Sequence, residues 1–209
     1  MFAENHIENL RQILEMNCKP SDELVTDLEN HAELKHFSRG EIIIRQGEMC
    51  SHLVFVRKGL MAVTNVTDGV EDTLLFGTAG DVYTSLHSYQ GGEPAAFSLI
   101  ALEESEVWLI EFIELKRLLA EHYDMMLWMH NLMIDQLYTF EKRYTIFNNK
   151  TAEERFVNFL LDRYGSIKRA PIRQIHRIVP LKYIAQYLNI TQSTLSRLRK
   201  KLVAGQGDF

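Results

Sequence analysis

The sequence predicts an α+β fold: an N-terminal antiparallel β jelly roll or barrel, then a long helix, then a C-terminal helical domain with a helix-turn-helix. Three observations predict it. Short runs rich in β-branched and aromatic residues alternate with glycines between residues 39 and 112, and a stretch without proline or glycine covers residues 114–148. Two short amphipathic segments then meet at a sharp turn near the C-terminus. With 209 residues, 46% of them hydrophobic and 24% charged, the chain can hold one large or two small domains.

The first 37 residues are predicted to be helical. An apolar stripe runs from His6 to Leu14, Pro20 interrupts it, and Ser21 begins a second helix. From Phe37 the period changes to that of short strands. The expected strands are the runs at residues 39–47, 52–57, 60–66, 72–76, 97–102 and 106–112, with turns at Gly40, Gly47, Gly59, Gly69 and Gly80. Strands of this length and spacing indicate an antiparallel barrel or jelly roll.

The segment from Glu114 to about Asn148 is predicted to be one long helix, because it contains neither proline nor glycine. Apolar residues repeat along one side at three-and-four spacing: Met126, Met129, Met133, Leu137, Phe140 and Tyr144. A second apolar face carries Leu127, Trp128, Leu132, Ile134 and Tyr138. One face can lie against the chain's own barrel while the other meets a second copy. We therefore expect a homodimer rather than a core helix of a single chain.

Residues 181–200 have the pattern of a helix-turn-helix. Asn189 stands where the turn needs a positive φ, and Thr191 can cap the second helix. Each helix has an apolar face, made of Ile184, Ala185 and Leu188 on the first and of Leu195, Leu198 and Leu202 on the second. Upstream, Thr151 and Glu154 form a predicted capping box that opens the first helix of this domain.

The charge of the chain is unevenly divided. From Lys150 onward it carries 12 basic and four acidic side chains, a charge of +8, so the preceding 149 residues carry −13 of the total of −5. A basic end on an acidic body is typical of a protein that binds double-stranded DNA through that end. The candidate DNA contacts are Lys182, Thr191, Gln192, Ser193, Ser196, Arg197, Lys200 and Lys201. The alternative is an ordinary helical hairpin with a solvated basic face.

Several other classes of protein fit the sequence less well. The N-terminus lacks the apolar core of a signal peptide and no apolar run approaches membrane-spanning length, so we expect a cytoplasmic protein without membrane contact. Cys18 and Cys50 cannot supply the four thiolates of an iron–sulfur cluster, and the histidines show no metal-ligand spacing, so neither cofactor is expected. The sequence also shows no Walker loop and no Ser-His-Asp order, which argues against an enzyme.

Three segments of the predicted barrel, Arg45-Gln-Gly-Glu48, Val56–Val63 and Gly80-Asp-Val82, resemble the cyclic nucleotide-binding domain of bacterial regulators. Together with the C-terminal helix-turn-helix, they make nearly the whole chain similar to the Crp–Fnr superfamily of transcription regulators. The resemblance implies a homodimer on a palindromic DNA site. It also adds RNA polymerase and an unidentified small-molecule effector as candidate partners. It places three residues of the second helix at base-reading positions: Gln192, Ser193 and Arg197.

The sequence differs from nucleotide-binding members in the expected ligand pocket. Those members use a Gly-Glu pair for the ribose and an Arg-Ser pair for the cyclic phosphate. Counting from Gly80-Asp81 places these pairs on Thr84-Ser85 and Ala95-Ala96. Neither alanine can bind phosphate, so we expect no tight binding of cAMP or cGMP. A more neutral ligand, or an empty vestigial pocket, would lie among Tyr83, Thr84, Ser85, His87, Ala95, Ala96 and Phe97.

The sequence thus predicts a sensor domain at residues 1–113, a dimerisation helix at 114–148 and a DNA-binding domain at 149–209. The expected function is sequence-specific DNA binding by a transcription regulator without enzymatic activity. Two alternatives use the same barrel. A protein-binding regulatory subunit would use its basic C-terminal region to dock onto another protein. A cupin-like enzyme would need a His/Glu metal cluster, which the spacing of these residues does not indicate.

Overall fold

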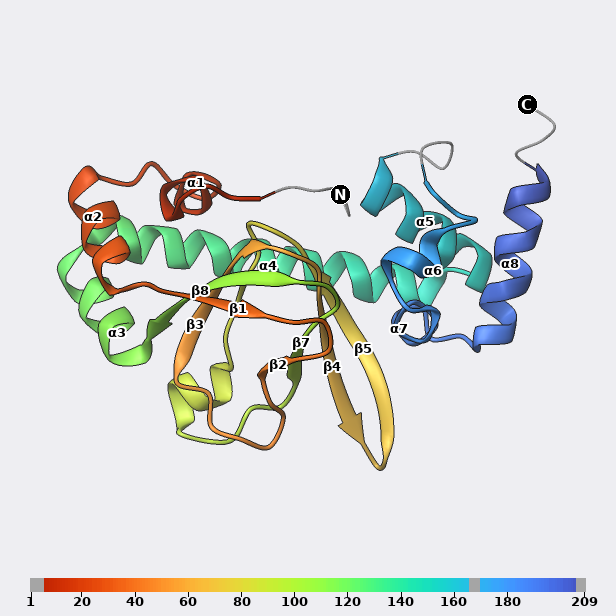
Figure 1. The fold of residues 1–209 in the computed structure, drawn as a ribbon, viewed down its shortest axis with the longest axis horizontal. Helices are drawn as coiled ribbons and strands as arrows, with labels where there is room; N and C mark the ends of the chain where they lie inside the picture. Colours follow the sequence, from red (N-terminus) through yellow and green to blue (C-terminus); the bar gives the residue numbers. More distant parts are fainter. Residues whose placement is uncertain (1–5, 166–169, 206–209) are drawn as a thin grey trace.

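The computed structural model describes residues 6–165 and 170–205. A domain of two β-sheets lies at one end, a long helix runs behind it, and a group of short helices lies at the other end (Figure 1). This arrangement confirms the predicted α+β fold class. Within the described residues, no helix combines the length and the apolarity needed to cross a membrane.

Two short helices come first, and a side chain caps the start of each. Asn9 accepts a hydrogen bond from the backbone N–H of Gln12 at 3.2 Å at the start of α1 (Leu10–Glu15). Ser21 accepts one from the N–H of Leu24, also at 3.2 Å, at the start of α2 (Asp22–His31). The second helix therefore begins at the predicted position.

The helical prediction is wrong for the residues after α2. Ala32 has an extended backbone, and Glu33–Phe37 form strand β1. This strand pairs along its whole length with β8 (Ser105–Glu111) in an antiparallel ladder. The pairing partner lies some seventy residues away in the sequence, and such tertiary pairing overrides a weak local preference.

The β domain consists of two four-stranded antiparallel sheets with the orders β1-β8-β3-β6 and β2-β7-β4-β5. The other strands are β2 (Ile42–Ile44), β3 (His52–Lys58), β4 (Met61–Thr67), β5 (Val70–Gly77), β6 (Val82–Tyr83) and β7 (Ser98–Ala101). Val54, Met61, Leu99 and Val107 belong to one buried cluster that joins the two sheets. The turn between β3 and β4 requires glycine, because Gly59 has a φ of 115° and a Cβ there would overlap Ser105.

The predicted long helix is interrupted at one residue. Helices α3 (Phe112–Glu121) and α4 (Tyr123–Asn149) are separated by His122, whose backbone is extended at φ −116° and ψ 111°. Atom Nε2 of the His122 ring lies 2.8 Å from Oδ2 of Asp27 on α2. This tertiary contact favours the extended conformation, and neither proline nor glycine marks it in the sequence.

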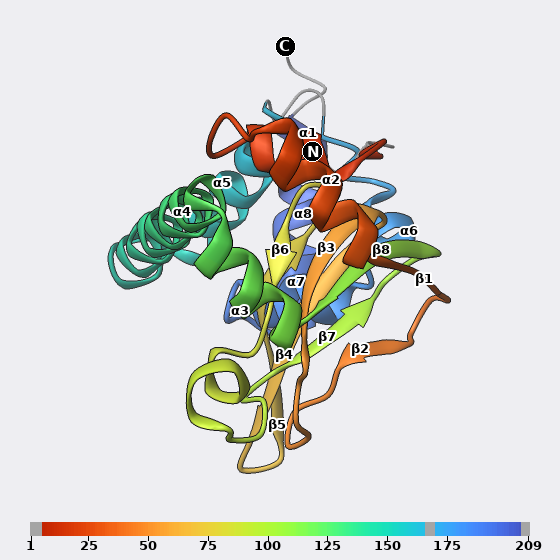
Figure 2. The same ribbon diagram turned by 90° about the vertical axis from the view of Figure 1, so that its left-hand side faces the viewer.

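Helix α4 lies beside the β domain and extends to the C-terminal helices (Figures 1 and 2). Its inner side carries the buried residues Met125, Trp128 and Leu132. The indole of Trp128 stacks on Phe55 of β3 with ring centroids 5.6 Å apart, and α1 and α2 contribute to the same apolar cluster. Part of one of the two predicted apolar faces of this helix therefore packs against the chain's own core.

The C-terminal domain contains α5 (Ala152–Tyr164), α6 (Ile175–Ile178), α7 (Leu181–Tyr187) and α8 (Gln192–Gly205). The predicted capping box of Thr151 and Glu154 opens α5 and is confirmed. The domain packs directly on the β domain: the ring of Phe76 on β5 lies 6.0 Å from that of Phe159 and 5.3 Å from that of Tyr187. One apolar cluster therefore joins the two domains.

Candidate nucleic-acid interface and sensor cavity

The helix-turn-helix has the predicted turn. Asn189 has a φ of 50°, in the left-handed region that asparagine tolerates better than most residues. The next residue, Ile190, is partly buried, and its N–H donates to the carbonyl of Ala185 at 3.0 Å. The buried side chain of Ala185 is small, which lets the two helices approach each other closely.

The second helix is fixed at its start and along one face. The hydroxyl of Thr191 accepts a hydrogen bond from the N–H of Thr194 at 3.1 Å, which confirms the predicted cap. Leu195 is fully buried, and Leu198 and Leu202 pack against the same core as α7. The orientation of α8 is thus set by its apolar face, and its opposite face is left to solvent.

That opposite face is polar and basic. Arg197 is exposed, and its guanidinium donates to the hydroxyl of Thr194 at 3.3 Å. Ser196 is half-buried. The other sequence-predicted contacts on this helix and its cap are all exposed: Thr191, Gln192, Ser193, Lys200 and Lys201. Such a row of donors can reach the base edges and phosphates of a major groove.

Two of the predicted DNA contacts, Lys201 and Lys182, form ion pairs within the chain. Lys201 lies 2.7 Å from a carboxylate oxygen of Glu153 on α5, and Lys182 lies 3.3 Å from one of Glu71 on β5. Both lysines are exposed, and exposed ion pairs contribute only about 0–1 kcal/mol. Each lysine can therefore exchange its carboxylate for a phosphate at small cost.

Sequence analysis missed that two arginines, Arg155 and Arg199, hold the interface in shape. Arg155 on α5 donates from Nε to the carbonyl of Leu188 at 3.0 Å, directly before the turn. Arg199 on α8 donates to the carbonyls of Ile172 at 3.1 Å and Arg173 at 3.0 Å, and burial lowers the pKa of its guanidinium. Their acceptors are backbone atoms of distant segments, so no local pattern marks these roles.

The structure places the residues predicted to form a barrel pocket in different surroundings. Ser85 is buried and shares a 3.1 Å hydrogen bond with Ser88, whose hydroxyl also donates to the carbonyl of Glu93 at 2.8 Å. Ala95 lies in the buried core between the sheets, with Phe97 packed against it. Thr84 is half-buried and donates to the carbonyl of His52, and His87 and Ala96 are exposed.

Tyr83, the remaining member of that set, lines a cavity. This cavity has a volume of about 430 Å³ and lies between the β domain, α4 and the C-terminal domain. Burial raises the pKa of the Tyr83 phenol well above its ordinary value. The cavity at the junction of the domains is therefore a second candidate effector site beside the predicted barrel pocket.

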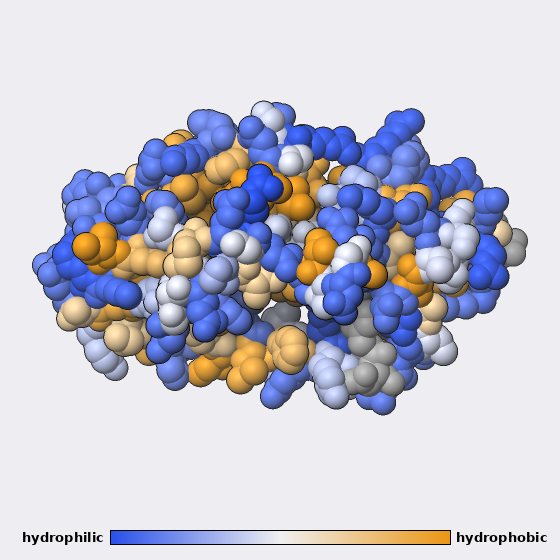
Figure 3. Space-filling view, turned by 90° about the horizontal axis from the view of Figure 1, so that it is seen from below, coloured by the Kyte–Doolittle hydropathy of each residue, from blue (hydrophilic) through white to orange (hydrophobic). Residues whose placement is uncertain are grey.

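The outward side of α4 carries an apolar surface. Leu137, Phe140 and Tyr144 are 61%, 65% and 65% exposed, and Met126 and Met133 are also exposed. Met129, also predicted at the dimer interface, is half-buried and packs against the chain's own core. The exposed set also includes Leu127, Ile134 and Tyr138. In the space-filling view from below, hydrophobic residues form several patches, one of them along the lower edge (Figure 3).

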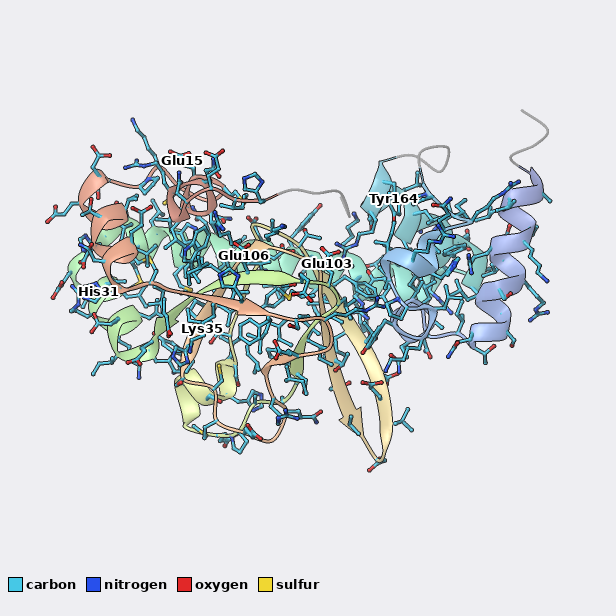
Figure 4. All side chains as sticks on the ribbon, viewed as in Figure 1. Glu15, His31, Lys35, Glu103, Glu106 and Tyr164 are labelled. Carbon is cyan, nitrogen blue, oxygen red and sulfur yellow. The ribbon has the colours of Figure 1, made fainter. Side chains whose placement is uncertain are left out.

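Asp27, Glu121 and His122 bring ligand-type atoms within 4.8 Å of one another. A cation of the chain already lies among them: the guanidinium of Arg117 donates to Asp27 at 2.8 and 3.0 Å and to Glu121 at 2.5 Å. These hydrogen bonds, and to a smaller extent the contact with His122, hold the pKa of Asp27 well below its ordinary value. His31 lies beside this cluster at the end of α2 (Figure 4). This ion-pair network joins α2 to α3 and to His122, the residue between α3 and α4.

Residues 34–122 match the model of the cyclic nucleotide-binding domain. The chain is 23% identical over 189 residues to the transcriptional activator protein Anr of Pseudomonas aeruginosa, covering 87% of this chain and 76% of that protein. It is 25% identical over 189 residues to the transcriptional activator protein FnrA of Stutzerimonas stutzeri, covering 88% and 75%.

A solved structure has the same fold over most of its length. FixK2 from Bradyrhizobium japonicum superposes with a TM-score of 0.67 at 20% identity, covering 84% of this chain and 86% of FixK2. The domain match, the long alignments and the order of barrel, helix and helix-turn-helix agree with the resemblance found in the sequence. Over most of its length the chain is thus similar to regulators of the Crp–Fnr type.

Proposed function

We propose that the chain is a homodimeric, sequence-specific DNA-binding transcription regulator that acts in the cytoplasm. The observation that carries this proposal is the solvent-exposed polar and basic face of α8, held by a turn with Asn189 at positive φ. Arg197 is the central reader, because a guanidinium can donate two hydrogen bonds to O6 and N7 of guanine. The two curated relatives are named as transcriptional activators, which agrees with the proposal.

The dimer forms along the apolar surface of α4. Side chains such as Leu137 and Phe140 are mostly exposed in one chain, and a second copy would remove their area from water. A twofold axis beside α4 presents two α8 helices to the same side of a duplex. Half-sites are then spaced by about one helical turn, ~34–36 Å, and the DNA site is palindromic.

The three parts have separate roles in this proposal. Residues 1–113 sense a signal, 114–148 dimerise and 149–209 bind DNA, with α4 beginning at Tyr123. The signal is not cAMP or cGMP, because alanines stand at the two positions that would hold the cyclic phosphate and Ala95 is buried in the barrel core. RNA polymerase is a further partner expected of a transcription regulator.

Selection of bound duplexes from a random pool tests the proposal. The wild-type protein is expected to enrich a palindrome, and Arg197→Ala is expected to lose it. Arg45→Ala is the matched control, because Arg45 is an exposed arginine of the β domain, outside the helix-turn-helix. Discrimination by one bidentate arginine corresponds to about 1–3 kcal/mol, or roughly fivefold to 150-fold in affinity.

The salt dependence of binding gives an independent check. Several phosphate contacts produce a steep fall in affinity as salt rises, and Lys200→Ala is expected to reduce that slope by about one unit without changing the selected sequence. Enrichment of no sequence at all, both without ligand and in the presence of metabolite extract, contradicts the proposal.

A further inference from the structure

The cavity at the domain junction has the size of a small-molecule site. Its volume of about 430 Å³ falls in the range of ~300–1,000 Å³ that is usual for such pockets. Phe76 and Tyr83 line it from the β domain, Arg143 from α4, and Arg155 and Arg163 from α5. A molecule bound here would touch all three parts of the chain at once.

The residues around this cavity carry an excess of positive charge. Four cationic and two acidic side chains line it, a difference of +2. One of the cations, Lys142, lies 3.0 Å from Asp162. The other acid, Asp81, accepts a hydrogen bond from the N–H of Thr78 at 2.7 Å, and burial raises its pKa, which disfavours its negative charge. The electrostatic field in the cavity therefore favours an anion.

Backbone carbonyl oxygens position the guanidinium groups. Arg143 donates to the carbonyl of Thr73 at 3.4 Å, and Arg163 donates to that of Phe76 at 3.2 Å. Arg155 is held at the helix-turn-helix by its bond to the carbonyl before the turn. Burial lowers the pKa of Arg143, so its positive charge is poorly solvated. A guanidinium presents a planar fork of donors that matches a carboxylate or a phosphate group.

An aromatic wall lies next to these cations. The ring centroids of Phe76, Phe159 and Tyr187 are 5.3, 5.6 and 6.0 Å apart in their three pairs. The guanidinium of Arg143 lies 4.7 Å from the ring centroid of Tyr187. Flat apolar surfaces beside guanidinium groups suit a ligand that combines a planar ring with a negative charge.

We propose that this cavity binds a small organic anion, a planar ring that carries a carboxylate or phosphate group. The anion contacts cations of both α4 and α5 and so ties the C-terminal domain to the helix and to the β domain. A ligand that bridges these parts stabilises the docked arrangement over any arrangement in which they separate. Its effect on DNA rests on the proposed function, whereas the binding of the anion does not.

Benzoate and phenyl phosphate are the probes, and benzyl alcohol is the uncharged control with the same ring. In calorimetric titrations of the full-length protein at constant ionic strength, at least one anion is expected to bind and benzyl alcohol is not. Arg143→Gln and Arg163→Gln are each expected to weaken anion binding by about tenfold or more, because each removes charge-assisted hydrogen bonds. Arg45→Gln, at an exposed arginine that does not line the cavity, is expected to bind like the wild type.

Two measurements keep the test independent of folding defects. Lys142→Gln changes an exposed side chain of the cavity rim, and it too is expected to weaken binding. In phenylglyoxal labelling read by mass spectrometry, phenyl phosphate is expected to protect Arg143, Arg155 and Arg163 but not Arg45. Failure of both anions to bind overturns the proposal, as does equal binding of benzyl alcohol or unchanged affinity in arginine variants that melt like the wild type. Anion binding without any change in DNA affinity leaves the site in place and overturns only its regulatory role.

Discussion

The side-chain amide of Gln186 on α7 donates a hydrogen bond to the backbone carbonyl of Glu71 on β5 at 2.7 Å. The same amide accepts one from the hydroxyl of Thr73 at 2.8 Å. Through these two bonds the first helix of the helix-turn-helix is fastened to the edge strand of a β-sheet. This glutamine therefore couples the helix-turn-helix to the β domain, beside the Lys182–Glu71 ion pair and the ring contacts of Phe76.

Removing this amide should loosen the contact between the domains. We expect Gln186→Ala to lower the free energy of unfolding by about 1–3 kcal/mol, because the hydroxyl of Thr73 and the carbonyl of Glu71 each lose a hydrogen-bond partner. Hydrogen–deuterium exchange should rise in α7 and β5 and stay unchanged in β1 and β8. Gln174→Ala, at an exposed glutamine of the same domain, is the control. Unchanged exchange in β5 would show that the apolar contacts alone hold the domains together.

The turn of the helix-turn-helix should discriminate between two substitutions at one position. Asn189 has a positive φ, so Asn189→Gly should preserve stability, whereas Asn189→Val should cost about 1–2 kcal/mol. Thermal unfolding followed by circular dichroism measures both. The prediction fails if the two variants melt at the same temperature.

The apolar surface of α4 should respond to a buried charge if it forms the dimer interface. We expect Leu137→Glu to convert the dimer to monomers in sedimentation velocity experiments, because two carboxylates would lie close to the twofold axis without partners. Leu34→Glu makes the same change at an exposed leucine on β1 and should remain dimeric. A monomeric wild type, or a dimeric Leu137→Glu variant, would place the interface elsewhere.

Acid should weaken the ion-pair network around Asp27. Its hydrogen bonds from Arg117, and then its contact with His122, hold its pKa below the ordinary value of 3.8, so the folded state binds fewer protons there than the unfolded state. The stability that this carboxylate contributes is therefore present above about pH 4 and is lost as the pH falls through the folded-state pKa.

The variant Asp27→Asn makes that dependence measurable. In urea unfolding, we expect it to be less stable than the wild type at neutral pH and the difference to shrink as the pH falls below about 4. Asp72→Asn, at an exposed carboxylate on β5, should show little difference at any pH. A gap between wild type and Asp27→Asn that stays constant from neutral to acid pH would show that the shape of the side chain matters rather than its charge.

Much of the fold follows from local patterns in the sequence. The caps at Ser21 and Thr151 and the turn at Asn189 use side chains that satisfy their own neighbouring backbone, so a few adjacent residues determine them. The missed features have partners far along the chain. Strand β1 exists because β8 pairs with it, and the break at His122 accompanies a contact with Asp27.

The candidate sites also differ in whether local sequence or distant contacts determine them. The exposed face of α8 follows from helical periodicity, so its residues could be found by spacing alone. The cavity could not, because its cations on α4 and α5 meet the β domain only after the domains pack. Of the loop residues that the family pattern indicates, Tyr83 lines this cavity, whereas Ala95 lies in the buried core between the sheets.

The apolar cluster that runs from the β domain into the C-terminal helices limits how this chain can be divided. Phe76 and Leu102 belong to the same buried cluster as Phe156 and Phe159. A fragment cut at residue 150 would leave both halves with uncovered aromatic surface, so neither half should stay well dispersed alone. Swapping the helix-turn-helix onto a foreign barrel should likewise fail unless the residues that contact it on β4 and β5 travel with it. The two domains are separate in the sequence, yet they share one apolar core.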